Sequence, residues 1–177
     1  TPLSGGDKLM EPMAIRLTGN YKFSIIVTQV GAGHWQKAPL AKSLVVIPGN
    51  RLDLKGTPIT IFITYCIRMF MATKIILEKF KDISFLYSST NILPDVLPAF
   101  FAKLRFPKTI WIARVHHLIP PPGKREGKFI VNLVSYLMQS LALFMIKRKA
   151  DIIISLNERL KDELLNRGFP ESKLEVL

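Results

Sequence analysis

Cysteine and histidine are scarce in this chain, which has one cysteine, Cys66, and three histidines among 177 residues. A single cysteine excludes an internal disulfide, and a reducing compartment is the simpler interpretation. So few side chains leave no zinc-ligand spacing, and the sequence predicts no metal site. The sequence also lacks a Walker loop, a G-x-G-x-x-G fingerprint and a G-x-S-x-G elbow. The sequence therefore contains no motif that would indicate a P-loop NTPase, a dinucleotide-binding enzyme or an α/β-hydrolase.

Acidic residues are also few. There are 13 Asp and Glu against 25 Lys and Arg, which gives a net charge of +12, and the chain is 49% hydrophobic. A soluble nucleic-acid-binding protein is usually more polar, and we find no aromatic residues interleaved with Lys and Arg on one face. A basic and apolar chain favours an anionic membrane surface as its partner. A basic composition without any partner is the alternative.

Short apolar runs alternate with longer helical patterns along the chain. Most of the runs are continuously apolar, as in strands that are buried on both faces of a parallel sheet. The predicted strands are residues 23–30, 44–47, 83–87, 109–115 and 151–154. The predicted helices are residues 7–17, 57–80, 93–104 and 128–149, and a last one that Asn157 caps and Gly168 ends. The pattern predicts an α/β fold with a Rossmann-like, doubly wound parallel sheet.

Two of the helical segments are apolar enough to raise the question of a membrane span. Residues 59–77 contain Arg68 and Lys74, which are costly inside a bilayer. Residues 129–146 carry no charge, but Asn132 and Gln139, with two further polar residues, share one side of that helix. A helix with one polar seam between two strands is typical of a crossover packed on a sheet. A true span is the alternative.

Ligands of doubly wound sheets bind beyond the carboxyl ends of the strands, which selects four loops here. In the first, residues 1–7, Gly5 and Gly6 precede a helix, so backbone amides can approach a phosphate. An ordinary turn with a helix cap is the alternative. The second, residues 30–39, places His34 and Trp35 beside glycines, a set that can hold a sugar or a lipid head group. A tight loop with a surface aromatic is the alternative.

The other two loops are residues 88–95 and 116–128, and the last of these is the most informative. It begins with His116 and His117 at the end of a strand and continues into a basic, proline-rich segment. A histidine there can orient a substrate hydroxyl or support charge on a phosphate. A single buried histidine bonded to backbone is the alternative.

The chain as a whole resembles the N-terminal domain of the retaining glycosyltransferases of family four, which have the GT-B fold. Residues 4–7, Ser-Gly-Gly-Asp, resemble the glycine-rich loop that follows the first strand of that family. Residues 115–118, Val-His-His-Leu, resemble its strand-end histidine motif, commonly His-Asp-Leu, so either histidine can hold the family position. The end of that domain is matched by residues 150–155, Leu164, and residues 168–170 and 173–177.

This resemblance implies a hexosyltransferase-type enzyme that transfers a sugar from a nucleotide-sugar donor to a glycan, polysaccharide or lipid-linked acceptor with retention. It implies no cofactor and no obligatory metal. Gly5 and Gly6 are the expected donor diphosphate contacts, and His116 and His117 the expected catalytic positions. The expected acceptor contacts are Asp7, His34 and Trp35.

The resemblance also predicts how the chain is organised. Residues 1–177 are expected to form one N-terminal, acceptor-side domain, with the first strand before Thr1 and the donor-binding domain after Leu177 both outside the chain. Lys124, Arg125 and Lys128 are the predicted contacts to an anionic membrane. We therefore expect a cytoplasmic protein at the inner face of the membrane that does not bind nucleic acid. A non-catalytic peripheral membrane protein is the competing hypothesis.

Overall fold

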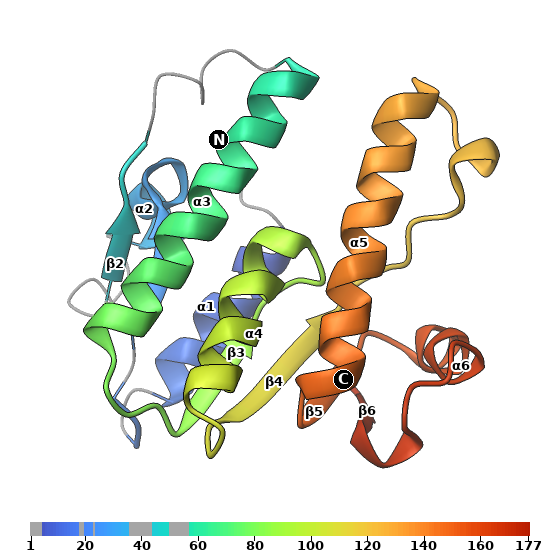
Figure 1. Cartoon of the computed structure of the whole chain (residues 1–177). Coiled ribbons are helices and arrows are strands. Elements are labelled where there is room, and N and C mark those ends of the chain that lie inside the picture. The colour runs from blue at the N-terminus through green and yellow to red at the C-terminus, as the bar shows by residue number, and fades with distance from the viewer. Residues whose placement is uncertain (1–4, 18–19, 23, 36–43, 50–56) are drawn as a thin grey trace. The chain divides into compact units, whose positions relative to one another are not determined.

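The computed structural model describes residues 5–17, 20–22, 24–35, 44–49 and 57–177 (Figure 1). It divides into two compact units, Thr1–Ala72 and Thr73–Leu177, and each unit is described here by itself. Every described strand pair is parallel, and helices separate the strands along the chain. The protein has the predicted Rossmann-like, doubly wound α/β fold. The strand expected before Thr1 and the assignment of residues 1–177 to one domain stay predictions.

The first unit contains a two-stranded sheet. Its elements are α1 (Gly5–Leu17), β1 (Ile25–Thr28), α2 (Gln29–Trp35), β2 (Leu44–Ile47) and the first part of α3 (Pro58–Lys79), which runs on into the second unit. β1 and β2 pair from Ile25 opposite Leu44 to Thr28 opposite Ile47. Ala14 and Trp35 form the buried core of this unit, and four partly buried residues pack against them: Met10, Ile25, Val27 and Leu44.

Helix α2 corrects the prediction of a loop over residues 30–39. Residues 29–35 are helical, and residues 36–39 lie outside the described residues. Gly31 and Gly33 weaken helix propensity, which is why the sequence favoured a loop. Burial of Ala32 and Trp35, which are 3% and 4% exposed, stabilises the helix instead. Trp35 is therefore a core residue, and its ring does not lie at the surface as the predicted acceptor contact required.

The second unit contains a four-stranded sheet in the order β3-β4-β5-β6. Its strands are β3 (Phe85–Ser88), β4 (Ile110–Val115), β5 (Ile152–Ser155) and β6 (Leu174–Val176). The connecting helices are α4 (Leu93–Arg105), α5 (Phe129–Lys149) and α6 (Glu158–Asn166), with two short 3-10 helices, η3 (Pro122–Lys124) and η4 (Glu171–Lys173). The chain thus passes through a helix from each strand to its neighbour in the sheet, the kind of connection that parallel strands need.

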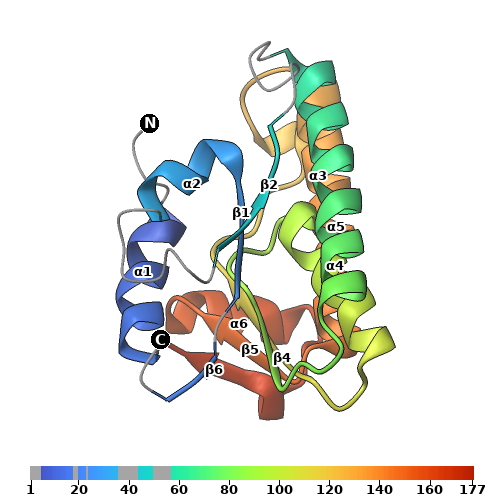
Figure 2. The same ribbon diagram turned by 90° about the vertical axis from the view of Figure 1, so that its left-hand side faces the viewer.

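Small side chains let α4 and α5 pack closely on one face of this sheet (Figures 1 and 2). Trp111, Ala113 and Val115 alternate along β4 and are completely buried. Ala102 of α4 and Ala142 of α5 are also completely buried. The predicted strand and crossover helices are confirmed, but β4 is not fully buried on both faces as expected, because Ile110 on the other face is 37% exposed.

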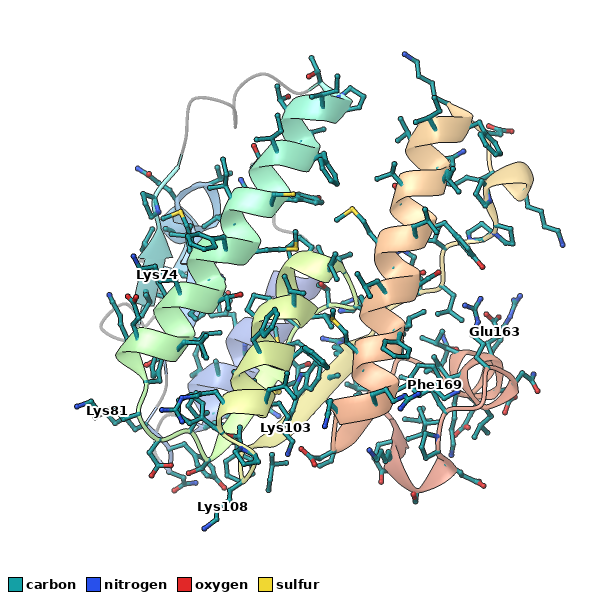
Figure 3. The ribbon with its side chains drawn as sticks, in the orientation of Figure 1. Lys74, Lys81, Lys103, Lys108, Glu163 and Phe169 are labelled. Carbon is teal, nitrogen blue, oxygen red and sulfur yellow. The ribbon has the colours of Figure 1, made fainter. Side chains whose placement is uncertain are left out.

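Helix α6 ends as the sequence predicts. The Asn157 side chain accepts a hydrogen bond from the Leu160 N–H at 2.9 Å, which is the predicted N-cap. At the other end Gly168 has a φ of 74°, and the N–H of Phe169, which is labelled in Figure 3, donates to the Leu164 carbonyl. A glycine in this left-handed conformation is the usual helix terminator.

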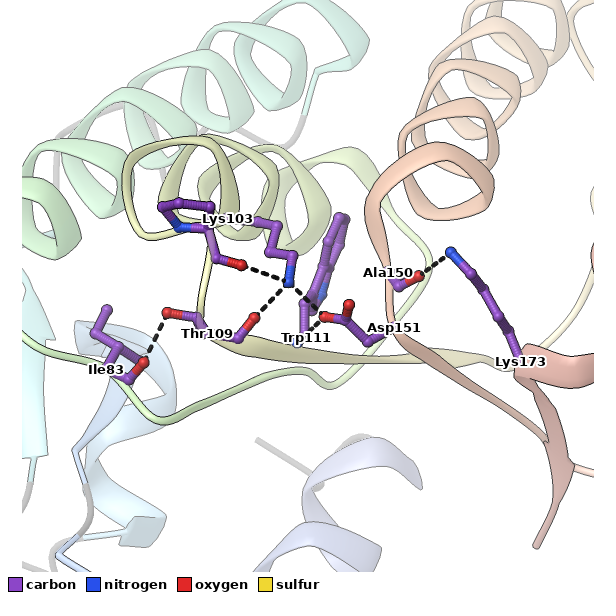
Figure 4. Close-up of polar contacts among 8 residues, drawn as sticks. Ile83, Lys103, Thr109, Trp111, Ala150, Asp151 and Lys173 are labelled. Carbon is purple, nitrogen blue, oxygen red and sulfur yellow. Dashed lines mark hydrogen bonds and ion pairs between the residues drawn. The ribbon is translucent and has the colours of Figure 1, made fainter.

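A charged cluster ties together the starts of the strands, at the edge opposite their carboxyl ends (Figure 4). The Lys103 ammonium lies 2.7 Å from a carboxylate oxygen of Asp151 and donates to the Thr109 and Pro107 carbonyls. The same Asp151 oxygen accepts the Trp111 N–H at 2.7 Å. The cluster therefore joins α4 to the first residues of β4 and the residue before β5.

Candidate functional site

The carboxyl ends of β3 and β4 carry the polar groups of the second unit that form a candidate site. β3 is followed by Ser89, Thr90 and Asn91, and β4 is followed by His116 and His117. The two strands are adjacent and parallel, so these loops meet at one edge. Of the three loops expected to cluster at one edge, residues 1–7, 88–95 and 116–128, the last two meet, and the place of the first stays a prediction. Residues 1–7 belong to the first unit.

Asn91 holds the two loops together. It is 1% exposed. Its Oδ1 accepts the His116 N–H at 3.2 Å, and its Nδ2 donates to the His117 carbonyl at 2.8 Å. One amide side chain thereby replaces the backbone pairing that would have continued the sheet beyond β4.

The two histidines have different surroundings. The His116 ring is half-buried, and its Nε2 lies 2.7 Å from the Ser89 carbonyl oxygen. A carbonyl oxygen can only accept, so Nε2 carries the hydrogen, and in the neutral ring Nδ1 keeps the lone pair. His117 is exposed, and only its backbone carbonyl takes part in the described hydrogen bonds. The geometry therefore orients the ring of His116.

Gln139 of α5 fixes the next part of the loop. It is 4% exposed, and it donates from Nε2 to the His117 carbonyl at 3.0 Å. Its Oε1 accepts the Ile119 N–H. The polar seam predicted for α5 is confirmed, and the loop after β4 is its partner. The sequence identified the seam but not its target.

Asn132 fixes another part of the loop in the same way, from a position seven residues earlier in α5. Its Nδ2 donates to the Arg125 and Glu126 carbonyls at 3.1 and 3.2 Å. Gly127 turns the chain there with a φ of 106°. The segment that holds the basic residues is thereby tied to the start of α5, with Lys124, Arg125 and Lys128 exposed at its surface.

Asp95 orders the loop after β3. Its Oδ2 accepts the Ser89 and Thr90 hydroxyls at 3.0 and 2.6 Å. Asp95 lies in the first turn of α4, where a carboxylate also interacts favourably with the helix dipole. This arrangement fixes the Ser89 carbonyl that the His116 ring contacts.

Arg114 is a buried cation two residues before His116 that sequence reasoning missed. Its side chain is 2% exposed, and its Nε and Nη2 have no hydrogen-bond partner among the residues that the structure describes. Burial raises the pKa of the neighbouring Tyr87, and the charge of Arg114 and a hydrogen bond from it oppose that rise. The only signal in the sequence was an arginine inside the apolar run of β4.

The predicted site residues of the first unit are only partly described. Gly5 and Gly6 form the first turn of α1, where backbone amides lack helical acceptors. Asp7 and His34 lie in α1 and α2, but their side chains are outside the described residues. Within the described part of the chain, His, Cys, Asp and Glu side chains form no group of three that could hold a metal ion.

Comparison with known proteins adds no assignment. No protein-family model matches the chain, and no curated protein matches it.

Proposed function

We propose that the chain is the acceptor-side half of a retaining, nucleotide-sugar-dependent glycosyltransferase. The observation that carries the proposal is the fixed His116 ring at the carboxyl end of β4, the edge at which doubly wound folds bind ligands. The resemblance in residues 4–7 and 115–118 supplies the reaction class. The acceptor is a glycan, polysaccharide or lipid-linked sugar at the cytoplasmic face of the membrane.

The reaction exchanges one bond at the anomeric carbon of the donor sugar. The bond to the leaving diphosphate oxygen breaks, a bond to the acceptor oxygen forms on the same face, and the hydroxyl proton leaves with the diphosphate. His116 positions the reacting hydroxyl or sugar through its Nδ1, because Nε2 is engaged by Ser89. In the family that the chain resembles, the glycine-rich loop contacts the donor diphosphate through backbone amides, and Gly5 and Gly6 are the matching positions. Asn91 is a positioning residue that acts through the His116 backbone.

Transfer requires a second wall of the cleft, because positioning of both substrates supplies much of the rate. In the family that the chain resembles, this wall is the donor-binding domain. We therefore expect the 177-residue chain alone to be inactive, whereas the full reading frame transfers sugar. The test is a screen of nucleotide sugars for hydrolysis and transfer with the full-length protein.

The histidine pair provides a matched mutational test. In the full-length enzyme His116→Ala should lower kcat by about 100-fold or more, the size expected for loss of a positioned acid, base or hydrogen-bonding group. His117→Ala, at an exposed neighbouring position, should stay within about threefold of the wild type, as expected for an exposed site that touches no reacting group. Equal losses, or a larger loss for His117→Ala, would show that His116 is not the histidine in the family position.

A non-catalytic peripheral membrane protein is the second candidate. Its specific support is the apolar outer face of α5, on which Ile130 and Leu137 are 73% and 56% exposed. If no nucleotide sugar is turned over by the full-length protein, while it binds anionic vesicles, this second function replaces the first.

A further inference from the structure

Helix α5 has an apolar stripe on the side that faces away from the sheet. The stripe follows helical spacing of three and four residues and consists of five residues: Ile130, Val134, Leu137, Leu141 and Phe144. Their exposed fractions run from 37% to 73%. Fourteen steps along the helix make the stripe about 21 Å long. A surface helix of a soluble protein normally carries polar residues there, so the stripe indicates an interaction surface.

The opposite face of α5 is packed and cannot face lipid. Ala142 and Ile146 are completely buried, and Asn132 and Gln139 are hydrogen-bonded to the loop after β4. Helices α3 and α5 are both long and apolar enough to cross a bilayer by length and composition alone. For α5 a crossing would separate the helix from α4, against which it packs closely, and would break the Gln139 hydrogen bonds. Its packed face therefore favours a helix that lies on a membrane.

Basic residues bracket the stripe at both ends. Lys124, Arg125 and Lys128 precede it and are exposed, and Arg148 and Lys149 follow it and are also exposed. The Arg148 guanidinium lies over the Phe144 ring, with its central carbon 5.2 Å from the ring centroid, so this cation stays with the stripe. Helix α5 contains no Asp or Glu.

We infer that the stripe of α5 docks on the surface of an anionic lipid bilayer, with the helix axis parallel to the membrane plane. The five side chains enter the interfacial region, and the basic residues at either end contact lipid phosphates. This extends the membrane partner of the proposed function from the basic loop to an apolar face, and it does not depend on sugar transfer. Snorkelling lets long basic side chains stay at the head groups while the stripe is buried.

The charge distribution favours lipid over a second copy of the chain. Two stripes packed against each other would bring two sets of five basic residues close together, with Glu126 of the flanking loop and no acidic residue of α5 to offset them. An anionic bilayer supplies the missing opposite charge along the whole length of the stripe.

Vesicle binding by the 177-residue chain and by the full-length protein tests this docking. The probes are vesicles of phosphatidylcholine and phosphatidylglycerol at about two to one, with phosphatidylcholine alone as the neutral reference. Leu137→Gln with Leu141→Gln should weaken binding to the anionic vesicles about tenfold, because two half-exposed leucines lose their burial in lipid. Removing the charges of Lys124, Arg125 and Lys128 should also weaken binding and reduce its dependence on salt.

The matched control removes three charges from α6 and its end instead: Arg159→Gln, Lys161→Gln and Arg167→Gln. This triple variant has the same net charge as the loop variant and should bind more tightly than it. Equal weakening by both triple variants would overturn the proposal that this surface docks on lipid. The net charge of +12 would then be enough to explain the binding. Circular dichroism should show unchanged folding for every variant, because all of the altered side chains lie at least partly at the surface.

A fluorescent probe reports whether the stripe itself enters lipid. Cys66→Ser removes the lone cysteine, and an environment-sensitive dye is then placed on Leu137→Cys or on the exposed control Asp162→Cys of α6. Anionic vesicles should raise and blue-shift the emission from position 137 only. An unchanged signal at 137 despite binding, equal binding to neutral vesicles, or a dimer that fails to bind vesicles would each overturn the docking. If the full-length protein transfers sugar to a soluble acceptor but does not bind anionic vesicles, the docking is refuted and the proposed function stands.

Discussion

The Lys103–Asp151 pair in Figure 4 offers a sharp test of how the second unit is held together. Lys103→Met keeps most of the apolar stem and removes the ammonium group. Three acceptors then lose this donor: the Asp151 carboxylate and the carbonyls of Thr109 and Pro107. The carboxylate keeps its hydrogen bond from the Trp111 N–H.

The expected loss lies between the values for exposed and buried ion pairs. Lys103 is 14% exposed and Asp151 is 40% exposed, so water can reach one side of the pair. Exposed pairs contribute up to about 1 kcal/mol, and removal of one partner of a buried pair costs about 3–5 kcal/mol. We expect Lys103→Met to lower the free energy of unfolding by about 2 kcal/mol, from the intermediate burial.

The pH dependence of stability gives an independent measure of the same contact. Burial raises the pKa of Asp151, but the hydrogen bond from Lys103, then that from the Trp111 amide and the charge of Lys103, outweigh burial and lower it overall. A lowered pKa stabilises the fold above the unfolded-state value near 3.9, and this contribution is lost as pH falls through the folded-state value. The wild type should therefore lose more stability between about pH 5 and pH 2 than Asp151→Asn does, because only the wild type has a carboxylate whose protonation weakens the contact.

The assay is urea unfolding followed by Trp111 fluorescence in a Trp35→Phe background. Lys74→Met is the control, because Lys74 and Glu78 form a pair at 3.9 Å with side chains 58% and 64% exposed. It should change the free energy of unfolding by less than about 0.5 kcal/mol. If Lys103→Met lowers the free energy of unfolding no more than this control does, the cluster does not stabilise the second unit and the reasoning is refuted. A steeper acid limb for Asp151→Asn than for wild type would reverse the sign of the pKa argument.

Three further predictions concern helix ends and the site. Asn157→Ala should cost about 1 kcal/mol in urea unfolding, because the Leu160 N–H loses its cap; an unchanged midpoint would contradict this. Gly168→Ala should cost about 1 kcal/mol or more, because φ is 74° and a Cβ there would lie 2.9 Å from the Lys147 ammonium, whereas Gly123→Ala, with nothing within 4 Å, should be close to neutral. Asn91→Ala should speed hydrogen exchange of the His116 amide at least tenfold, as loss of one hydrogen bond worth about 1.4 kcal/mol implies, and unchanged exchange would show that another group protects it.

Much of the fold was predictable because the apolar runs are short, buried and well separated. The strand at residues 44–47 was predicted to the residue, and α4 differs from its prediction by one residue at its end. Strand β6 was not predicted, because three residues, Leu174–Val176, are too few to show a period. Helix α2 was predicted as a loop, because two glycines outweighed a tryptophan whose burial depends on residues elsewhere in the chain.

The candidate site was predictable only in outline. A doubly wound pattern indicates which loops meet, so the ends of β3 and β4 could be paired in advance. The roles of Asn91 and Gln139 could not, because each depends on contacts with residues 20 or more positions away in sequence. Arg114 was hidden for another reason. A single charged residue does not disturb an apolar run of six, and its burial beside Tyr87 appears only in the folded sheet.

Different chemistry fixes the two ends of strand β4. At its start the Trp111 N–H is held by a charged cluster, in which Asp151 pairs with Lys103. At its end two neutral amides, Asn91 and Gln139, hold the backbone of the histidine pair. A neutral side chain fixes geometry without placing a formal charge beside the ring, so a substrate phosphate approaching His116 meets no carboxylate from these two residues. The charged cluster stabilises the opposite edge, about 20 Å away along a six-residue strand. These neutral contacts suit the proposed function, because they fix the His116 backbone without adding a carboxylate to the one that Asp95 already places in the loop after β3.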